Sequence, residues 1–463
     1  MKNFFKKAFL TLCLVSIVSC SDDDDTIFIP DTMTIADFVS DNADYSSLLA
    51  ALQRTDLDVT LNGNGDFTVF APNNAAFTEF LDGTALEDVP VETLRQILLN
   101  HVLGVRAPSS GLTTGYVNNL ATEANSSANL SMYINTSSGV VINGESTVTT
   151  PDIMTDNGII HAVDKVIPLP TMLTFVAADS EFSSLASVAT TTTGFTTDFE
   201  AVLSGADSNL TLLAPDNAAF TALGDISGVP VATLEQILLN HVIAGTNISS
   251  GLTTGYGNTL ATYSDTMNNL SIYINTDGGV SFNGISTVTQ ADIVASNGVI
   301  HKVGAVITLP TVVTFATADA NFSTLVSALT DLTPATDFAS ILSRTEGGNL
   351  DSIDPAFTVF APLNSAFDAL TEIPDESGLT PILLHHVIAN ANVRSGDLSD
   401  GLVTPGTLEG DPLTVIIPGT NSAIANLTDG GGNTDIEVVA VDVQASNGVI
   451  HVINKVMIPN QLN

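Results

Sequence analysis

The heptapeptide ASNGVIH occupies residues 295–301 and recurs unchanged at 445–451, and a near copy, TDNGIIH, occupies residues 155–161. Each copy ends in a histidine, in a chain of 463 residues that has seven histidines. A histidine that recurs in one setting could be a metal ligand, a catalytic base or a packed structural residue. Each of these roles requires different neighbouring residues, so the rest of the sequence helps to decide between them.

Two other motifs recur in the same order ahead of this stretch. The first is a proline-centred box and the second a leucine-rich box: TVFAPNNAAF (68–77), TLLAPDNAAF (211–220) and TVFAPLNSAF (358–367), then QILLNHVL (96–103), QILLNHVI (236–243) and PILLHHVI (381–388). The repeat length is about 145 residues, whereas a solenoid repeat has roughly 20–50. Each repeat is therefore expected to be a globular domain.

The repeats divide the chain into three expected domains, which cover residues 34–170, 171–310 and 311–459. The junctions, PLPTMLTF and TLPTVVTF, contain proline and have no run of glycine and serine. Because proline restricts the backbone, the joints should be short and stiff. We therefore expect a rod of closely spaced domains.

Each copy changes from helical to strand periodicity along its length. In the first copy, Leu48 and Leu52 lie one helical turn apart, and the segment 89–102 is a second amphipathic helix. Later come short β-rich runs such as LSMYIN (130–135) and GIIHAV (158–163), separated by Gly, Asn, Ser and Asp. Helices in the first half and strands in the second indicate the α+β class.

The proline-centred box, the leucine-rich box and the closing NG[IV]IH segment closely resemble the motifs of the fasciclin (FAS1) domain. The resemblance covers nearly all of residues 34–459, three times over. It implies that each copy is a two-sheet β-wedge flanked by helices, placed outside the cell or at its surface, with a role in adhesion or matrix binding. It implies no catalytic activity and no cofactor.

The leucine-rich box departs from the family pattern at one position. Animal members often have a Tyr-His pair there that is linked to integrin binding, and this chain lacks the tyrosine, so integrin binding is not carried over. A surface-binding role remains open. The residues at these positions form the candidate interaction region: Asn100, His101, Asn240, His241, His385 and His386.

The closing histidines, His161, His301 and His451, are expected to be structural. Apolar residues lie on both sides of His451, which is typical of a buried central strand. A neutral imidazole there can donate one hydrogen bond and accept another, tying the strand to a loop. The Asn-Gly before each histidine is expected to form a turn in which glycine adopts a positive φ.

The metal and catalytic alternatives find little support in the sequence. Zinc needs three or four ligands, usually including a close pair, but each copy offers two histidines about 60 residues apart. There is no HExxH motif and no Gly-x-Ser-x-Gly elbow, and both cysteines lie within the first 20 residues. We therefore expect no metal site, no catalytic residue and no enzyme.

The N-terminus has the pattern of a bacterial lipoprotein signal peptide, expected over residues 1–20. Lys2, Lys6 and Lys7 precede an apolar run that is too short to span a bilayer. SIVSC then resembles a lipoprotein box, in which Cys20 is acylated and becomes the mature N-terminus. Residues 21–33 are an acidic spacer, and their SDDDD run resembles a surface-export signal of some Gram-negative lipoproteins; the alternative is a solvated spacer.

The charge of the chain restricts its partners. Fifty Asp and Glu residues oppose eleven Lys and Arg residues, for a formal net charge of −39. Nucleic acid is excluded as a partner because binding to phosphate requires a basic surface. Direct contact with an anionic membrane is disfavoured for the same reason.

Together these patterns predict an outer membrane lipoprotein, exposed at the cell surface, that mediates adhesion. The expected partner is an unknown surface protein or glycan, with a lipid anchor in the membrane. The alternative is an envelope scaffold without an external ligand, and an enzyme that uses the recurring histidines is the least favoured hypothesis.

Overall fold

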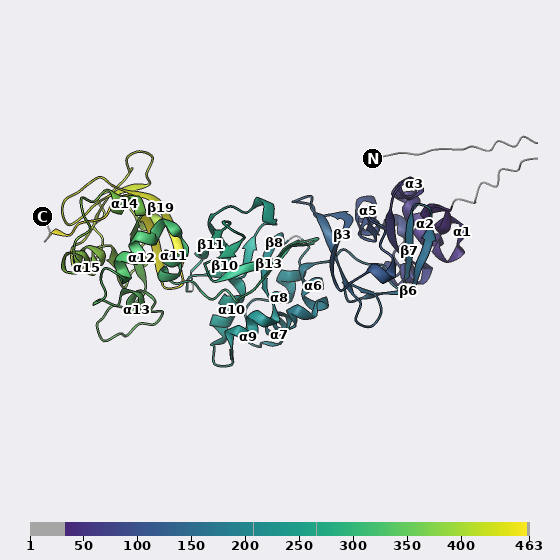
Figure 1. Cartoon of the computed structure of the whole chain (residues 1–463), viewed down its shortest axis with the longest axis horizontal. Helices are drawn as coiled ribbons and strands as arrows, with labels where there is room; N and C mark the ends of the chain where they lie inside the picture. Colours follow the sequence, from purple (N-terminus) through teal and green to yellow (C-terminus); the bar gives the residue numbers. More distant parts are fainter. Residues whose placement is uncertain (1–32, 207, 265, 461–463) are drawn as a thin grey trace, which may run out of the picture.

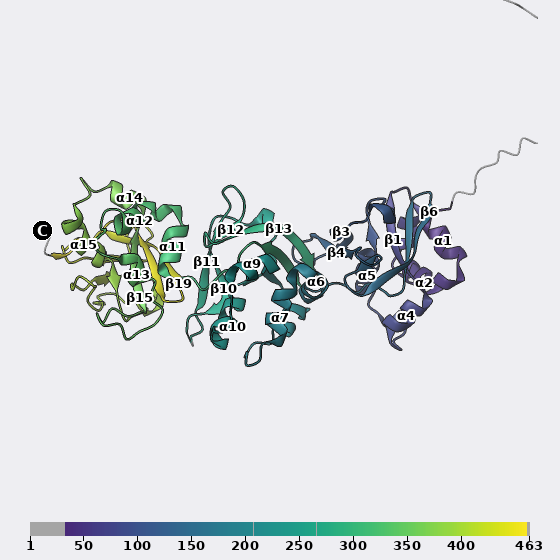
Figure 2. The same ribbon diagram turned by 60° about the horizontal axis from the view of Figure 1, so that its bottom comes forward.

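The computed structural model describes residues 33–460 apart from residues 207 and 265. The expected signal peptide, Cys20 and nearly all of the acidic spacer lie outside the described residues. The three domains lie in a row, with α1 of the first domain at one end and the third domain at the other (Figures 1 and 2). Each has helices and one set of connected strands, which confirms the α+β class.

In the first domain the described elements are α1 (Ile35–Asp41), η1 (Ala43–Tyr45), α2 (Ser46–Arg54), α3 (Leu57–Asn62), β1 (Phe67–Pro72), α4 (Asn74–Leu81), η2 (Leu86–Asp88), α5 (Val91–Asn100), β2 (Val102–Leu103), η3 (Ser109–Gly111), β3 (Gly115–Thr122), β4 (Asn129–Asn135), β5 (Val141–Ile142), β6 (Ser146–Thr155) and β7 (Gly158–Val163).

In the second domain they are α6 (Met172–Ala178), η4 (Ser180–Phe182), α7 (Ser183–Thr191), α8 (Phe199–Ser204), β8 (Leu210–Pro215), α9 (Asn217–Leu223), α10 (Val231–Leu239), β9 (Val242–Ala244), η5 (Ser249–Gly251), β10 (Gly255–Thr262), β11 (Asn269–Asn275), β12 (Ser281–Phe282), β13 (Ser286–Ala295) and β14 (Gly298–Val303).

In the third domain they are α11 (Val312–Ala318), η6 (Ala320–Phe322), α12 (Ser323–Thr330), α13 (Phe338–Leu342), β15 (Phe357–Pro362), α14 (Asn364–Asp368), α15 (Glu376–Leu384), β16 (Val387–Ile388), η7 (Ser395–Asp397), β17 (Thr414–Ile416), β18 (Ala425–Thr428), β19 (Ile436–Ala445) and β20 (Gly448–Ile453).

Local sequence explains where the helices of the first domain begin and which faces they bury. The Asn73 side chain accepts a hydrogen bond from Ala76 N at 2.9 Å and so caps α4. In α5, Leu94, Ile97 and Leu98 are buried, which is the inward face that the helical periodicity predicts.

The strand orders show that the proline-centred box and the closing motif form neighbouring strands in each domain, although they are distant in sequence. In the first domain the order is β2-β1-β7-β6-β5-β4-β3, so the closing strand β7 lies between β1, to which it is parallel, and β6, to which it is antiparallel. All six residues of β7 are buried, as the apolar pattern predicts. In the second domain, pairing of Thr259 with Ile243 closes the same order into a barrel. The third has six strands, β16-β15-β20-β19-β18-β17.

The glycine that opens each closing strand is needed for close approach of the parallel strand. A Cβ on Gly298 would lie 2.0 Å from the Leu210 carbonyl oxygen, and the φ of Gly298, +150°, lies in a range that residues with a Cβ rarely adopt. The residues before it do form a turn, as expected. Gly298 has the expected positive φ, whereas Gly158 and Gly448 do not adopt one in the range that favours glycine. In all three closing strands the missing Cβ also permits the close approach of the parallel strand.

The joint between the first two domains is a packed interface and not a linker. The Tyr116 hydroxyl donates a hydrogen bond to Asp179 Oδ2 at 3.1 Å, and the Tyr116 ring meets Phe175 edge-on at 5.4 Å. The backbone N–H of Val294 donates to the Ser131 hydroxyl at 2.9 Å. Burial raises the pKa of the Tyr116 hydroxyl, so it remains a proton donor to Asp179.

The second joint repeats these contacts. Tyr256 donates to Asp319 Oδ2 at 3.1 Å and meets Phe315 edge-on at 5.6 Å, and Gln444 N donates to Ser271 Oγ at 3.0 Å. Because the same donors and acceptors recur, the two joints are one interface used twice. This geometry is the short connection that the proline-containing junctions predict, and the stiffness of the joint stays a prediction.

No single helix in the part of the chain that the structure describes is long and apolar enough to cross a membrane; the bent pair Val312–Ala318 and Ala320–Thr330 meets the length and composition criteria together.

Candidate functional site

The closing histidines each connect three parts of a domain. His161 Nε2 lies 2.9 Å from the Ala107 carbonyl, to which it donates, and Nδ1 accepts from Asp152 N at 3.1 Å. Asp152 is the extra residue of a β-bulge in β6, and its N–H would otherwise have no strand partner. The histidine therefore fastens the closing strand to a bulge on one side and to a loop on the other.

The other two copies repeat this arrangement with one difference. His301 contacts the Asn247 carbonyl at 2.9 Å and Asp292 N at 3.2 Å, and His451 contacts the Val393 carbonyl at 2.8 Å. His451 Nδ1 has no hydrogen-bond partner among the described residues. Burial lowers the pKa of His301 and His451, which favours the neutral ring. These contacts support the structural role expected from the sequence.

The histidines of the leucine-rich box use the opposite tautomer. His101 Nδ1 donates to the Ile97 carbonyl at 2.7 Å, and Nε2 accepts from Ile167 N at 2.8 Å. His241 and His386 make the equivalent pairs of bonds. Each ring therefore joins the end of a helix to the segment that follows the closing strand. Burial lowers the pKa of all three rings to about 4, so they are neutral near pH 7.

The structure places the whole candidate interaction region inside the domains. Its six side chains are at most 2% exposed: Asn100, His101, Asn240, His241, His385 and His386. The Asn100 amide donates to the Ile167 and Pro168 carbonyls at 3.2 and 2.9 Å, so the segment after the closing strand covers it. A partner at the surface cannot contact these side chains directly, so a binding surface must be formed by other residues.

Sequence reasoning missed the asparagine of the closing motif. Asn297 is 1% exposed; its Oδ1 accepts from Met172 N at 2.9 Å and its Nδ2 donates to the carbonyls of Leu203 and Gly205 at 2.9 and 3.1 Å. It thus joins the start of α6 to the end of α8. Asn157 and Asn447 make the same three bonds in the other domains.

One group of side chains in the third domain has the composition of a metal site. His385, Glu409 and Asp411 bring potential ligand atoms within 4.8 Å of one another. His385 Nε2, however, accepts a hydrogen bond from Gly430 N at 3.1 Å, so Nδ1 must carry the ring proton. Nδ1 is the nitrogen that lies 3.5 Å from Glu409.

The neighbour of that nitrogen supports the same assignment. The Thr407 hydroxyl donates its hydrogen to the Asp411 carbonyl at 2.9 Å and can therefore accept from His385 Nδ1 at 3.2 Å. The proton on Nδ1 occupies the position that a metal ion would need. The arrangement is a hydrogen-bonded buried histidine, and we assign it no metal.

Comparisons with known proteins agree with the geometry. The family model described as Fasciclin domain matches residues 43–170, 180–310 and 320–459. Transforming growth factor-beta-induced protein ig-h3 of Sus scrofa is 28% identical over 433 residues, covering 90% of this chain and 56% of that protein. Periostin of Homo sapiens is 26% identical over 441 residues, covering 92% of this chain and 47% of that protein.

A bacterial relative matches one domain more closely. Protein sll1483 of Synechocystis is 35% identical over 143 residues, covering 30% of this chain and 75% of that protein. The chain spans about half the length of ig-h3 and periostin. Because the family model covers most of the sequence in three separate matches, the chain belongs to the fasciclin domain family and contains three tandem copies of that domain.

Proposed function

We propose that this protein is a lipid-anchored outer membrane lipoprotein, exposed at the cell surface, that uses three fasciclin domains for adhesion to a surface protein or glycan. The observation that carries the proposal is the row of three domains held by two equivalent joints, with the first described residues at its outer end by α1 (Figure 1). A lipid on Cys20 would hold such a row by one end. The third domain would then be the farthest from the membrane.

The net charge of the chain limits the chemistry of the partner. At −39, the protein repels other anionic surfaces at low ionic strength. The contact surface of the partner should therefore be neutral or basic, and nucleic acid is excluded. The family resemblance supports adhesion. The histidines of the leucine-rich box are buried with both ring nitrogens hydrogen-bonded, so they offer no group to a substrate.

The anchoring and display are tested together in cells. We expect the wild-type chain to incorporate labelled palmitate, to fractionate with the outer membrane and to be cleaved by protease added to intact cells. Cys20→Ser should remove the label and release the protein from the membrane. If the wild type carries no label, the anchor is refuted; if it is labelled but protected from protease, the envelope scaffold replaces surface display.

The adhesion is tested on defined surfaces. Cells with and without the protein are compared on a panel of matrix proteins and neutral or basic glycans, with the Cys20→Ser strain as a control that makes the chain but does not retain it. We expect the wild type alone to adhere to at least one surface. Equal adhesion of all three strains on every surface would refute the adhesive function.

A further inference from the structure

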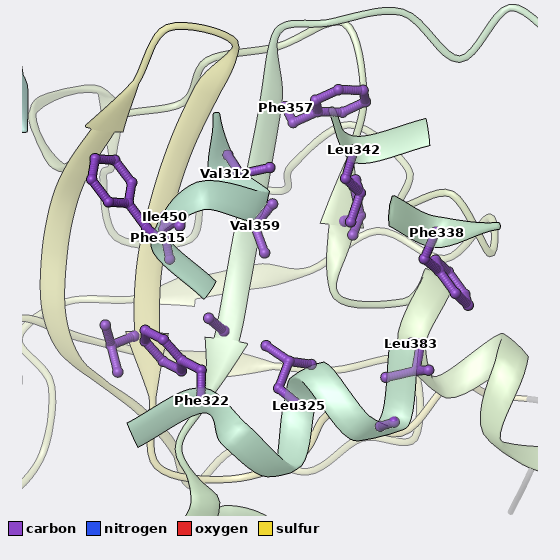
Figure 3. Close-up of a cluster of buried hydrophobic side chains, with 14 of the residues drawn as sticks. Val312, Phe315, Phe322, Leu325, Phe338, Leu342, Phe357, Val359, Leu383 and Ile450 are labelled. Carbon is purple, nitrogen blue, oxygen red and sulfur yellow. The ribbon is translucent and has the colours of Figure 1, made fainter. Parts of the chain in front are cut away.

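The third domain contains an apolar cavity of about 90 Å³ between three of its helices and its sheet. Figure 3 shows the buried cluster to which several of its lining side chains belong, among them Val312, Leu325 and Ile450. The chain turns by 95° between α11 and the segment Ala320–Thr330, so these helices diverge over the sheet. The cavity wall exposes apolar surface. It is lined by Val312, Val313, Ala316, Thr317, Phe322, Leu325, Val326, Leu329, Thr330, Phe338, Ala339, Leu342, Val359, Ala361 and Ile450.

The floor of the cavity exists because smaller residues occupy positions that are filled in the second domain. In the aligned repeats, Val312, Ala316 and Val359 stand where the second domain has larger side chains: Met172, Val176 and Leu212. At the rim the difference is reversed, because Val326 and Leu329 stand where the second domain has alanine at 186 and 189. Compared with the second domain, the third domain thus has smaller side chains at the bottom of the cavity and larger apolar side chains around its opening.

The cavity reaches from the core to the surface. Val312, Phe322 and Ile450 at its floor are at most 3% exposed, whereas Thr317 and Thr330 at its rim are exposed. Both rim hydroxyls donate to carbonyls of their own helices, at 2.9 and 2.8 Å, so neither is directed at a ligand in the cavity. A molecule inside would therefore meet hydrocarbon alone, while its outer end would meet water.

Two exposed acidic residues lie close in sequence to the rim of the cavity, and their carboxylates accept hydrogen bonds from Ser327 and Ser340. Asp331 follows Thr330 directly, and Asp337 lies two residues before Ala339, another rim residue. Both aspartates disfavour a carboxylate or phosphate at the opening. An uncharged head group meets no such repulsion.

We propose that this cavity binds the alkyl tail of an uncharged amphiphile and leaves the head group in solvent. At the ~30 Å³ that a water molecule occupies in the liquid, 90 Å³ holds about three groups of methylene size. Burial of each methylene should tighten binding about fourfold until the cavity is full. This site is independent of the proposed anchor and of adhesion.

The probes are linear alcohols of two to eight carbons, titrated into the unacylated full chain (Cys20→Ser) and followed by methyl NMR. We expect saturable shifts of the Val312, Leu325 and Ile450 methyl signals and an affinity that rises about fourfold per methylene before it levels off. Hexanoate should bind more weakly than hexanol. Absence of saturable shifts refutes the site, and hexanoate binding as tight as hexanol refutes the uncharged head group.

Restoring the side chains of the second domain provides the matched variant. Val312→Met, Ala316→Val and Val359→Leu together should weaken hexanol binding at least tenfold without lowering the melting temperature, and Ala316→Val alone serves if the triple variant does not fold. Val439→Leu, on the exposed surface of the same domain, should bind as the wild type does. Unchanged binding by a folded, filled variant would place the alcohol elsewhere and overturn the proposal.

Discussion

The asparagine of the closing motif offers the sharpest test of how the fold is held together. Asn297→Ala removes three hydrogen bonds to backbone groups and a longer one, 3.3 Å, to the Ser208 hydroxyl, at a side chain that is 1% exposed. Each of the three backbone bonds is worth about 1–1.5 kcal/mol, since buried backbone groups are left without partners. We therefore expect the second domain to lose roughly 3–4 kcal/mol of unfolding free energy, or about 10 °C in melting temperature.

The aspartate variant separates hydrogen bonding from side-chain size. Asn297→Asp has nearly the same volume and retains one acceptor, but it turns a carboxylate oxygen toward the carbonyls of Leu203 and Gly205. It should therefore be at least as unstable as the alanine variant at pH 7. Asn258→Ala, on the exposed surface of β10 in the same domain, is the control and should change stability by less than about 0.5 kcal/mol.

The assay must resolve one domain among three, because a chain of several domains does not unfold in one step. Urea unfolding followed by circular dichroism gives the overall loss, and hydrogen exchange with mass spectrometry locates it. Faster exchange is expected in α6 and α8, which the Asn297 amide joins. A loss below about 1 kcal/mol in the alanine variant, or an aspartate variant more stable than it, would refute the reasoning.

Four further outcomes are expected. Gly298→Ala should prevent normal pairing of β14 with β8, because its Cβ would lie 2.0 Å from a carbonyl oxygen; loss of exchange protection in β14 measures this, and a stable, protected variant would contradict it. Tyr256→Phe removes the bond to Asp319 and should widen the distribution of end-to-end distances in small-angle X-ray scattering, while each domain stays folded. The ring of His101 should titrate near pH 4 in NMR; because its pKa is lowered on folding, its stabilising contribution is present above about pH 6.5 and is lost as the pH falls toward 4. Val359→Leu fills part of a 90 Å³ cavity and should raise the stability of the third domain by at most about 2 kcal/mol in urea unfolding, whereas a loss would show overpacking.

Much of the fold could be predicted because its signals are local. The helix cap at Asn73 and the inward face of α5 depend on residues within a few positions of each other. The apolar run around each closing histidine likewise shows a strand buried on both faces. The repeats then placed each of these features three times.

The rest depended on contacts that no local pattern records. Asn297 accepts a hydrogen bond from Met172 at the start of α6, which lies 125 positions earlier in the chain. The residues around Asn297 therefore predicted a turn but could not predict this partner. The joint between Tyr116 and Asp179 spans 63 positions and two domains. The leucine-rich box was expected at the surface, but the segment beginning at Ile167 returns over it and accepts its hydrogen bonds.

The residues that recur in all three domains are therefore those that the fold requires, and a binding surface is to be sought among the residues that differ between the domains. The third domain differs from the other two in its sheet, which among the described residues has six strands where each of the others has seven. The Tyr273 hydroxyl also donates to Asp319 in the second joint, at 3.4 Å, and the third domain has Ile416 at this position. At the position of Asn240 it has His385. It also has the cavity floored by smaller residues. These differences make the third domain the first place to look for a binding surface among the three copies, and under the proposed anchoring at Cys20 it would be the copy farthest from the membrane.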